Sequence, residues 1–286
     1  MQDVGVDTAP SAPRDSLSAL LCLGVLAYVG ETLLHEAVGH GGMCLATGGR
    51  VTALAPLWMR CSVVTPVMIL CGPAINFFAG GLLFAVLRYA PPSGAAAREF
   101  LWLSFAFNLL VAFGYLVVGG ASGFGDWGVL LAGVRPAILW RLPAVLVGAA
   151  GYYAALIVAA RLYGRLNGAG AFAQGRLLGR TLVASAGAAI VACAAEIAGG
   201  RLAAGPLVLA LGCTLAVGAS LTRIGGFTRA RNPGQATLTP IRASPWLLAA
   251  GVAVALVFIF VVGPGFDASS AAAGVTPTGV AWPHRR

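Results

Sequence analysis

The chain has 286 residues, of which 59% are hydrophobic and only 9% carry a charge, and its mean hydropathy is +0.88. Soluble domains carry about 25% charged residues, so this composition excludes an ordinary soluble enzyme and indicates a helical protein that crosses a lipid bilayer several times. The formal net charge of +9 comes from arginine, which collects in the cytoplasmic loops of membrane proteins, so the charge does not call for a nucleic-acid partner.

In chain order, residues 1–16 are polar and proline-containing, which predicts a disordered tail. An apolar stretch follows at about residues 17–45. Residues 49–65 are apolar but interrupted by arginine and proline, which predicts an extended or hairpin segment at the membrane interface. Residues 266–286 again resemble a disordered tail. Further apolar stretches are long enough, or nearly so, to span hydrocarbon, at about residues 66–87, 100–118, 137–162, 181–198, 203–222 and 245–263.

These stretches predict an all-α polytopic membrane protein with about six to seven transmembrane helices and a short interfacial β-like segment. We expect it in a prokaryotic inner membrane. The loops after the fourth and sixth spans are rich in arginine, which places them and the N-terminus in the cytoplasm. These arginines are Arg161, Arg165, Arg176, Arg180, Arg223, Arg229, Arg231 and Arg242. Arg50, Arg60 and Arg135 fall on the other side, so the signal is a bias.

The cysteines are scattered, mostly in apolar segments, and none forms a Cys-x-x-Cys pair. This pattern favours small apolar core residues over a disulfide framework or a zinc knuckle. The residues concerned are Cys22, Cys44, Cys61, Cys71, Cys193 and Cys213.

Two histidines and a glutamate lie together near the end of the first apolar stretch, as His35, Glu36 and His40. An ionisable side chain at membrane depth costs about 3 kcal/mol or more, so such a group is a functional-site hypothesis by default. Imidazole and carboxylate groups are the ligands from which catalytic zinc sites are built. The stretch therefore predicts a metal centre.

The spacing of the two histidines poses a geometric question. In the helical motif His-Glu-x-x-His the imidazoles share a face and the glutamate is the general base. Here His40 follows His35 by one residue more, which leaves the rings about 140° apart on an ideal α-helix. One solution is a π-bulge, for which Gly39 is a permissive residue. In the second solution, Glu36 and His40, four residues apart, share a helix face and bind the metal, while His35 supports these ligands from outside or acts as the base.

A third ligand has to come from another part of the chain. The candidates are Asp126, in a glycine-rich turn, and Glu196. An ion pair with Arg201 is a sufficient explanation for Glu196, so Asp126 is the preferred ligand. Glu31 lies one helical turn before His35 and either orients its ring or faces an aqueous cavity.

In these residues the sequence resembles the site-2 protease family of intramembrane zinc metalloproteases. The similarity covers roughly residues 17–135 and lies in four pieces: the histidine–glutamate helix, residues 48–51, residues 72–76, and Asn108 followed by residues 125–128. The resemblance implies a three-span metalloprotease core, to which residues 136–265 add further helices. It implies one Zn²⁺ ion, held by His35, His40 and Asp126.

By the same resemblance, Glu36 is the general base that activates a water molecule, and the substrate is a protein or peptide embedded in the lipid bilayer. Asn76 and Asn108 either hold the substrate backbone and orient the site, or make interhelical hydrogen bonds. A site that contains a carboxylate also accepts iron or manganese.

Two other functions use the same ionisable groups. A transporter or ion channel could relay protons or cations along Glu31, His35, Glu36, His40 and Asp126. A non-proteolytic descendant of such a protease could keep the metal alone. The sequence shows no second, symmetric set of interrupted helices, which counts against transport.

Overall fold

The computed structural model describes residues 14–167, 171–201, 214, 216–221 and 239–267. Among these residues, six helices are long and apolar enough to cross a membrane, as expected for a multi-pass membrane protein. The expected span at residues 203–222 lies mostly outside the described residues, which include 214 and 216–221 of it. The helices are α1 (Leu17–Leu33), the π-helix η1 (Leu34–Gly41), α2 (Gly42–Ala46), α3 (Pro66–Tyr89), α4 (Ala95–Ser122), α5 (Gly125–Leu130), α6 (Ile138–Asn167), α7 (Ala171–Ala198), α9 (Pro245–Val257) and the π-helix η3 (Phe258–Val262).

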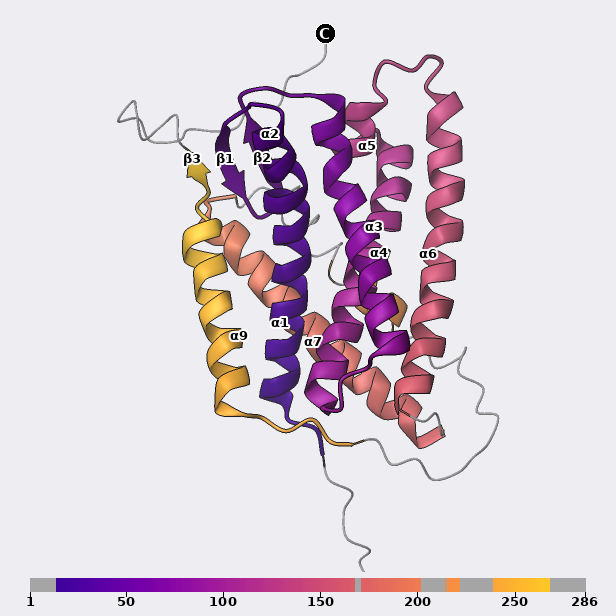
Figure 1. Cartoon of the computed structure of the whole chain (residues 1–286), viewed down its shortest axis with the longest axis vertical. Coiled ribbons are helices and arrows are strands. Elements are labelled where there is room, and N and C mark those ends of the chain that lie inside the picture. The colour runs from indigo at the N-terminus through magenta and orange to yellow at the C-terminus, as the bar shows by residue number, and fades with distance from the viewer. Residues whose placement is uncertain (1–13, 168–170, 202–213, 215, 222–238, 268–286) are drawn as a thin grey trace, which may run out of the picture.

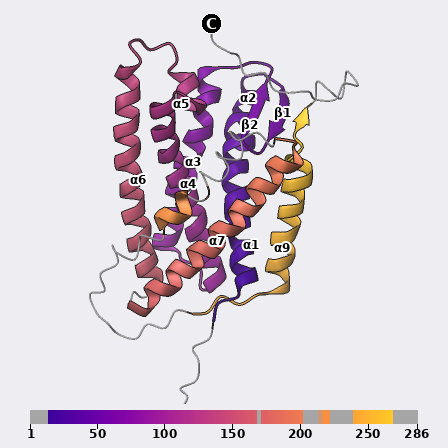
Figure 2. The ribbon, with the colours of Figure 1, turned by 180° about the vertical axis from the view of Figure 1, so that it is seen from behind.

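The first span is one continuous helical rod, Leu17–Ala46, built from α1, η1 and α2. Ser16 begins it, because its hydroxyl accepts a hydrogen bond from the Ala19 backbone nitrogen. The rod contacts α4, α7 and α9 and therefore lies inside the bundle, with α7 crossing behind it (Figures 1 and 2). Its N-terminal end and its η1 end lie at opposite ends of the molecule (Figure 1).

Small residues let α1 and α7 approach closely. A Cβ atom on Gly24 would overlap the backbone of Ala184, and one on Gly187 would overlap the backbone of Leu21. Since lipid tails are as apolar as leucine, helices in a membrane associate through this kind of close packing rather than through the hydrophobic effect. Because η1 continues α1, this close contact with α7 also fixes the position of η1 in the bundle.

The segment expected to be extended or a hairpin forms an antiparallel hairpin, with β1 (Val51–Ala55) and β2 (Trp58–Cys61). A third strand, β3 (Phe266–Asp267), pairs with β1, so the strand order is β2-β1-β3. Residues 266 and 267 are thus ordered, although the sequence places them in the C-terminal tail. The sheet lies at the same end as η1, α2 and α5 (Figure 1).

The prediction that the cysteines are separate core residues is wrong for two of them. Cys44 on α2 and Cys61 at the end of β2 form a disulfide. Cys22, Cys71 and Cys193 are free, and Cys213 lies outside the described residues. Spacing along the chain did not reveal the pair, because the hairpin brings together residues that belong to different elements.

A buried ionic cluster lies at the opposite end of the molecule. Arg180 was expected in a cytoplasmic loop, but it lies within α7 and is 2% exposed. Its guanidinium donates to both carboxylate oxygens of Asp15 at 2.8 and 3.0 Å, to Glu99 Oε2 at 3.2 Å, and to the Thr239 carbonyl at 2.7 Å. The loop interpretation is therefore wrong for Arg180, because the helix starts before it and its charge is paired inside the bundle. Arg161 and Arg165 also lie within α6, and Arg176 lies within α7, so this loop is shorter than expected. Asp15, expected in the disordered tail, is held by the same contact.

The predicted pairing of Glu196 with Arg201 is confirmed, at 2.6 Å between Arg201 Nε and Glu196 Oε2. Arg201 also donates to the carbonyl of Gly263 at 2.6 Å. This acid is engaged in holding α7 against the end of η3, which leaves it no part in a metal centre.

We expect Arg180→Ala to destabilise the protein by about 3–5 kcal/mol, because truncation leaves the Glu99 and Asp15 carboxylates buried without their cation. The measurement is thermal unfolding in detergent micelles. The exposed Arg165→Ala is the control and should change stability by less than about 0.5 kcal/mol. If the two substitutions lower stability equally, the ionic cluster around Arg180 makes no specific contribution to the stability of the protein.

Candidate metal centre

The helical turn that carries the two histidines is a π-helix, Leu34–Gly41. This confirms the π-bulge interpretation of the five-residue spacing. His35 and His40 are both buried, and their ring centroids lie 4.9 Å apart in an edge-to-face arrangement. A wider turn brings positions i and i+5 onto one face, and such turns concentrate at functional sites. The rings that an ideal α-helix would separate therefore lie side by side.

Glycines on two helices make room for the rings. A Cβ atom on Gly39 would lie 2.7 Å from the Cys71 carbonyl oxygen and 2.8 Å from the Cα of Gly72, so η1 and α3 touch backbone to backbone. A Cβ atom on Gly72 would in turn overlap the His40 ring and lie 2.8 Å from His35 Nε2. Only glycine leaves these positions open.

Asp126 comes to the histidines of η1 from a different element, the short helix α5. Helix α4 ends at Gly123 (φ 74°), Gly125 follows with φ 71°, and α5 places Asp126 in its first turn. Both glycines occupy left-handed backbone that other L-residues rarely adopt. The carboxylate Oδ2 lies 3.0 Å from His35 Nε2, and Oδ1 lies 3.3 Å from His40 Nε2. The glycine-rich turn therefore delivers the acid to both rings at once.

The imidazoles keep Asp126 ionised. Burial on its own would raise the pKa of this carboxyl, but hydrogen bonds from His35 and His40 outweigh burial and hold the pKa below its usual range. An ionised carboxylate is the form that binds a cation. Asp126 is thus in the binding form at neutral pH.

These three side chains form a group of metal-ligand type. One donor atom from each of His35, His40 and Asp126 lies within 4.8 Å of the other two. Zinc bonds of 2.0–2.1 Å in a tetrahedral site separate ligand atoms by roughly 3.3 Å, close to the two distances from Asp126. Two imidazoles and a carboxylate leave a fourth position open, which is the donor set of a catalytic rather than a structural zinc site.

Neighbouring groups orient the rings. His40 Nδ1 lies 2.9 Å from the carbonyl oxygen of Met68, and an Nδ1–H donates to it. Nε2 faces Asp126 and would become a metal ligand once it gives up the proton that it shares with that carboxylate. His35 Nδ1 lies 3.3 Å from the amide nitrogen of Asn76, which also donates to Glu31 Oε1 at 2.7 Å. Glu31 therefore reaches the ring through Asn76, and it also lines the cavity described below. Glu31 thus makes no direct hydrogen bond to the His35 ring in the described structure and lines the cavity.

The amide of Asn76 decides the tautomer of His35. With its nitrogen toward the ring, as placed, neutral His35 carries its proton on Nε2 and donates to Asp126. Rotating the amide would present Oδ1, which has no hydrogen-bond partner among the described residues, to an Nδ1–H. The amide oxygen and nitrogen are nearly isosteric, so this rotation frees Nε2 for a metal without moving the backbone, and it also turns Oδ1 toward Glu31 Oε1, which then has to carry a proton to keep that hydrogen bond.

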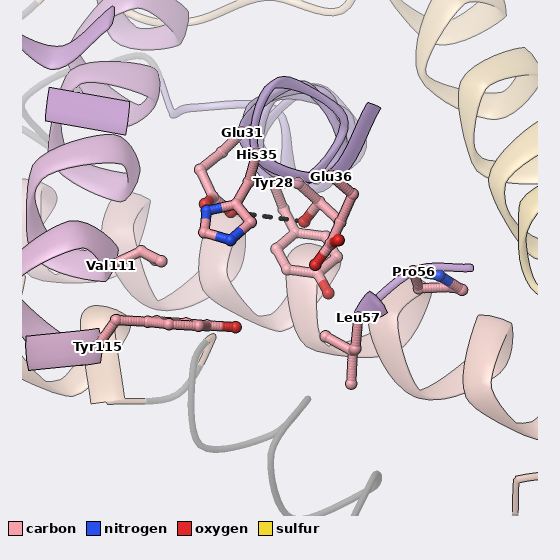
Figure 3. Close-up of a pocket in the computed structure, with 9 residues that line it drawn as sticks. Tyr28, Glu31, His35, Glu36, Pro56, Leu57, Val111 and Tyr115 are labelled. Atoms are coloured by element: carbon pink, nitrogen blue, oxygen red, sulfur yellow. Dashed lines mark hydrogen bonds between the residues drawn. The ribbon is translucent and has the colours of Figure 1, made fainter. Parts of the chain in front are cut away.

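Glu36 faces a small cavity beside the histidines. It is 5% exposed, and its Oε2 has no hydrogen-bond partner in the part of the chain that the structure describes. The cavity measures ≈ 20 Å³, enough for about one water molecule. Figure 3 shows His35 and Glu36 extending from the same helical turn, and Tyr115 approaching from below. The cavity lining comprises Tyr28, Glu31, Thr32, His35, Glu36, Pro56, Leu57, Val111 and Tyr115.

Sequence reasoning missed several of these positions. Tyr115 stacks at a tilt on His35, with centroids 5.4 Å apart, and lies two helical turns after Asn108 on α4. Leu57, at the hairpin turn, closes another side of the cavity. Tyr115 could have been predicted from its position, seven residues after Asn108 on the same face of a helix. No feature of the neighbouring sequence indicates that Leu57 lines the site. Asn108 itself donates to the Ser104 carbonyl of its own helix at 2.8 Å, so the structure does not bring its amide to the histidines.

No protein-family model matches the chain, and neither a curated protein nor a solved structure matches it. The function therefore has to be inferred from the side chains of this site and their geometry.

We expect Gly72→Ala to weaken zinc binding by roughly 100-fold, because changes that turn metal ligands away from their binding orientation lower metal affinity by up to that factor. Its new methyl group would occupy the space of the His40 and His35 rings. Gly81→Ala on the same helix is the matched control, because a Cβ atom there meets nothing within 4 Å. Zinc binding is measured by competition with a chromophoric chelator, and equal affinities in the two variants would contradict the assigned site.

Asn76→Leu should weaken zinc binding by about 10–100-fold, because it removes the amide that contacts Nδ1 and holds the His35 ring in place. Asn108→Leu provides the comparison, as it deletes a buried amide that bonds only within α4 in the described structure. If Asn108→Leu lowers zinc affinity as much as Asn76→Leu does, the orienting role of Asn76 is wrong.

Proposed function

We propose that the chain is an intramembrane metalloprotease of the site-2 protease type, which hydrolyses a peptide bond in or near the membrane. One observation carries the proposal: a π-helical turn brings His35 and His40 together, and Asp126 lies 3.0 and 3.3 Å from their Nε2 atoms. Of the segments that resemble that family, residues 72–76 supply Gly72 and Asn76 beside the rings, and residues 125–128 supply Asp126.

His35, His40 and Asp126 would hold one divalent ion. Zinc is the first candidate, and iron and manganese suit the same donors. When bound, such an ion lowers the pKa of a coordinated water and polarises a carbonyl oxygen. The fourth position, which these ligands leave open, is where the reacting groups would meet.

Glu36 has the chemistry of the general base. It directly follows His35, lines the same cavity, and has a carboxylate oxygen that no described residue binds. It would accept a proton from the attacking water and return that proton to the leaving amine, so that water and the peptide become a carboxylic acid and an amine. The water-sized cavity next to it gives the reactant a place within reach of the carboxylate.

The burial of the centre also favours catalysis over a simple relay of ions. Donor atoms from two elements that are far apart in the sequence point at a common volume within 4.8 Å, as one ion requires. A proton or cation pathway needs groups spaced along the membrane instead. The substrate class that fits a site inside the bundle is a membrane-embedded protein or peptide, and a prokaryotic inner membrane is the proposed location.

Glu36→Gln should retain stoichiometric zinc and lose about 10²–10⁴-fold in hydrolysis, because glutamine cannot accept the proton. The assay uses the purified chain in lipid vesicles with a set of labelled single-span peptides, and mass spectrometry identifies new termini. His40→Ala is the companion variant and should lose both the zinc and the hydrolysis. Metal-free wild-type protein that conducts protons across vesicles would instead support the transporter.

A further inference from the structure

The disulfide joins the helix that carries His40 to the hairpin beside the site. Cys44 lies one helical turn after His40, and Cys61 ends β2. Gly49 lies against both sulfur atoms, where a side chain would collide with them. In the strand register Cys61 pairs with Val51 at the open end of the hairpin, whereas Ala55 and Trp58 flank the turn. The bridge therefore anchors the base of the hairpin directly to the metal-ligand helix.

The turn of this hairpin is a wall of the catalytic cavity. Pro56 and Leu57 line it beside Glu36, as Figure 3 shows. At ≈ 20 Å³ the cavity admits about one water molecule and no peptide. The remaining lining residues belong to η1, α1 and α4, which are parts of membrane spans. The hairpin turn is thus the wall whose movement disturbs the least packing, and a substrate has to displace it.

Without the disulfide, short backbone pairings and the burial of Ala53 and Ala55, each 1% exposed, would hold the hairpin in place. Arg50 and Ser62 bond across its base at 2.9 Å, and two residues of β1 pair with β3. Strand pairs this short are marginal on their own. Opening the sulfur bridge would therefore leave a folded hairpin that can swing away from Glu36.

The bridge also indicates the side of the membrane. Stable disulfides form in oxidising compartments outside the cytoplasm. The bridge lies at the end of the first span opposite the N-terminus, and the arginine bias independently assigns the N-terminus to the cytoplasm (Figure 1). Two unrelated observations thus place the sheet, the disulfide and the metal centre toward the non-cytoplasmic face.

We propose that the Cys44–Cys61 disulfide is a redox latch, located on the non-cytoplasmic side, that holds the hairpin turn over the metal centre and limits substrate entry. A dithiol reductant opens it in two exchange steps: a thiolate attacks one sulfur to form a mixed disulfide, and the second thiol of the reductant then resolves it. Two electrons and two protons pass to the cysteines, which become thiols, and the reductant becomes a disulfide. As regulation of peptide cleavage, this inference rests on the proposed function.

The location is tested in intact cells. Free thiols are first blocked with a permeant maleimide, the cells are treated with the membrane-impermeant tris(2-carboxyethyl)phosphine, and new thiols are labelled with an impermeant maleimide. We expect a label on Cys61, which is partly exposed, without opening the cells, whereas Cys44 is 0% exposed and is labelled only as far as reduction opens the hairpin. Labelling that requires broken cells would overturn the assignment of the side.

The latch is tested on the purified zinc-loaded chain by hydrogen–deuterium exchange. Reduction should speed amide exchange in residues 51–61 by about tenfold, with zinc content unchanged, because sub-global opening becomes easier. The double variant C44S/C61S should behave like the reduced protein even under oxidising conditions, and Cys193→Ser, on α7, should behave like the wild type. Unchanged exchange in the hairpin on reduction of the folded wild-type protein would overturn the latch, whatever the fate of the double variant.

The same samples separate the latch from the proposed function. With the labelled single-span peptides, cleavage should rise several-fold on reduction, in parallel with exchange in the hairpin. Faster exchange with no cleavage in either redox state would contradict the protease and leave the latch standing. Cleavage that is equal in both states would overturn the latch as a control of entry.

Discussion

The wide helical turn at Leu34–Gly41 is the constraint on which the site depends. With regular α-helical spacing, His35 and His40 would diverge by about 140°, and no single ion could bind both. The turn is compatible with the bundle only because Gly39 allows the Cys71–Gly72 backbone to approach it. The geometry of the ligands therefore depends on the packing of the helices. Gly39 lets η1 touch α3, and Gly72 on α3 leaves room for the two imidazole rings.

Among the described residues, the buried ionisable side chains are gathered toward the two ends of the bundle. The metal-ligand group lies at the sheet end, and the Arg180 cluster lies at the end where α1 begins. Unpaired charges at membrane depth are costly, so each end satisfies its charges locally. Helix α1 links the two, because Asp15 just before it is held by Arg180 and the π-helix after it carries the histidines.

The first span, the hairpin and the pairing of His35 with His40 could be predicted because each is marked by residue type and local spacing. The approach of Asp126 could be expected only because few acids lie near the apolar spans and the family resemblance implies it. Hydrophobic length predicts spans, and buried ionisable groups in a span predict a site. The disulfide and the position of Arg180 could not be predicted, because both depend on contacts between distant segments. Leu57 was missed for the same reason: it reaches the cavity only through the fold of the hairpin.

Charge balance gives a reason to expect a cation in this centre and not a chain of proton carriers. Asp126 is held ionised by two imidazoles, and Glu36 adds a second buried carboxyl nearby. Two carboxylates close together in a medium of low dielectric repel each other, whereas a divalent ion offsets both charges at once. A metal would therefore replace the imidazole–carboxylate hydrogen bonds with shorter coordination bonds and leave Glu36 as the one group still available to exchange protons.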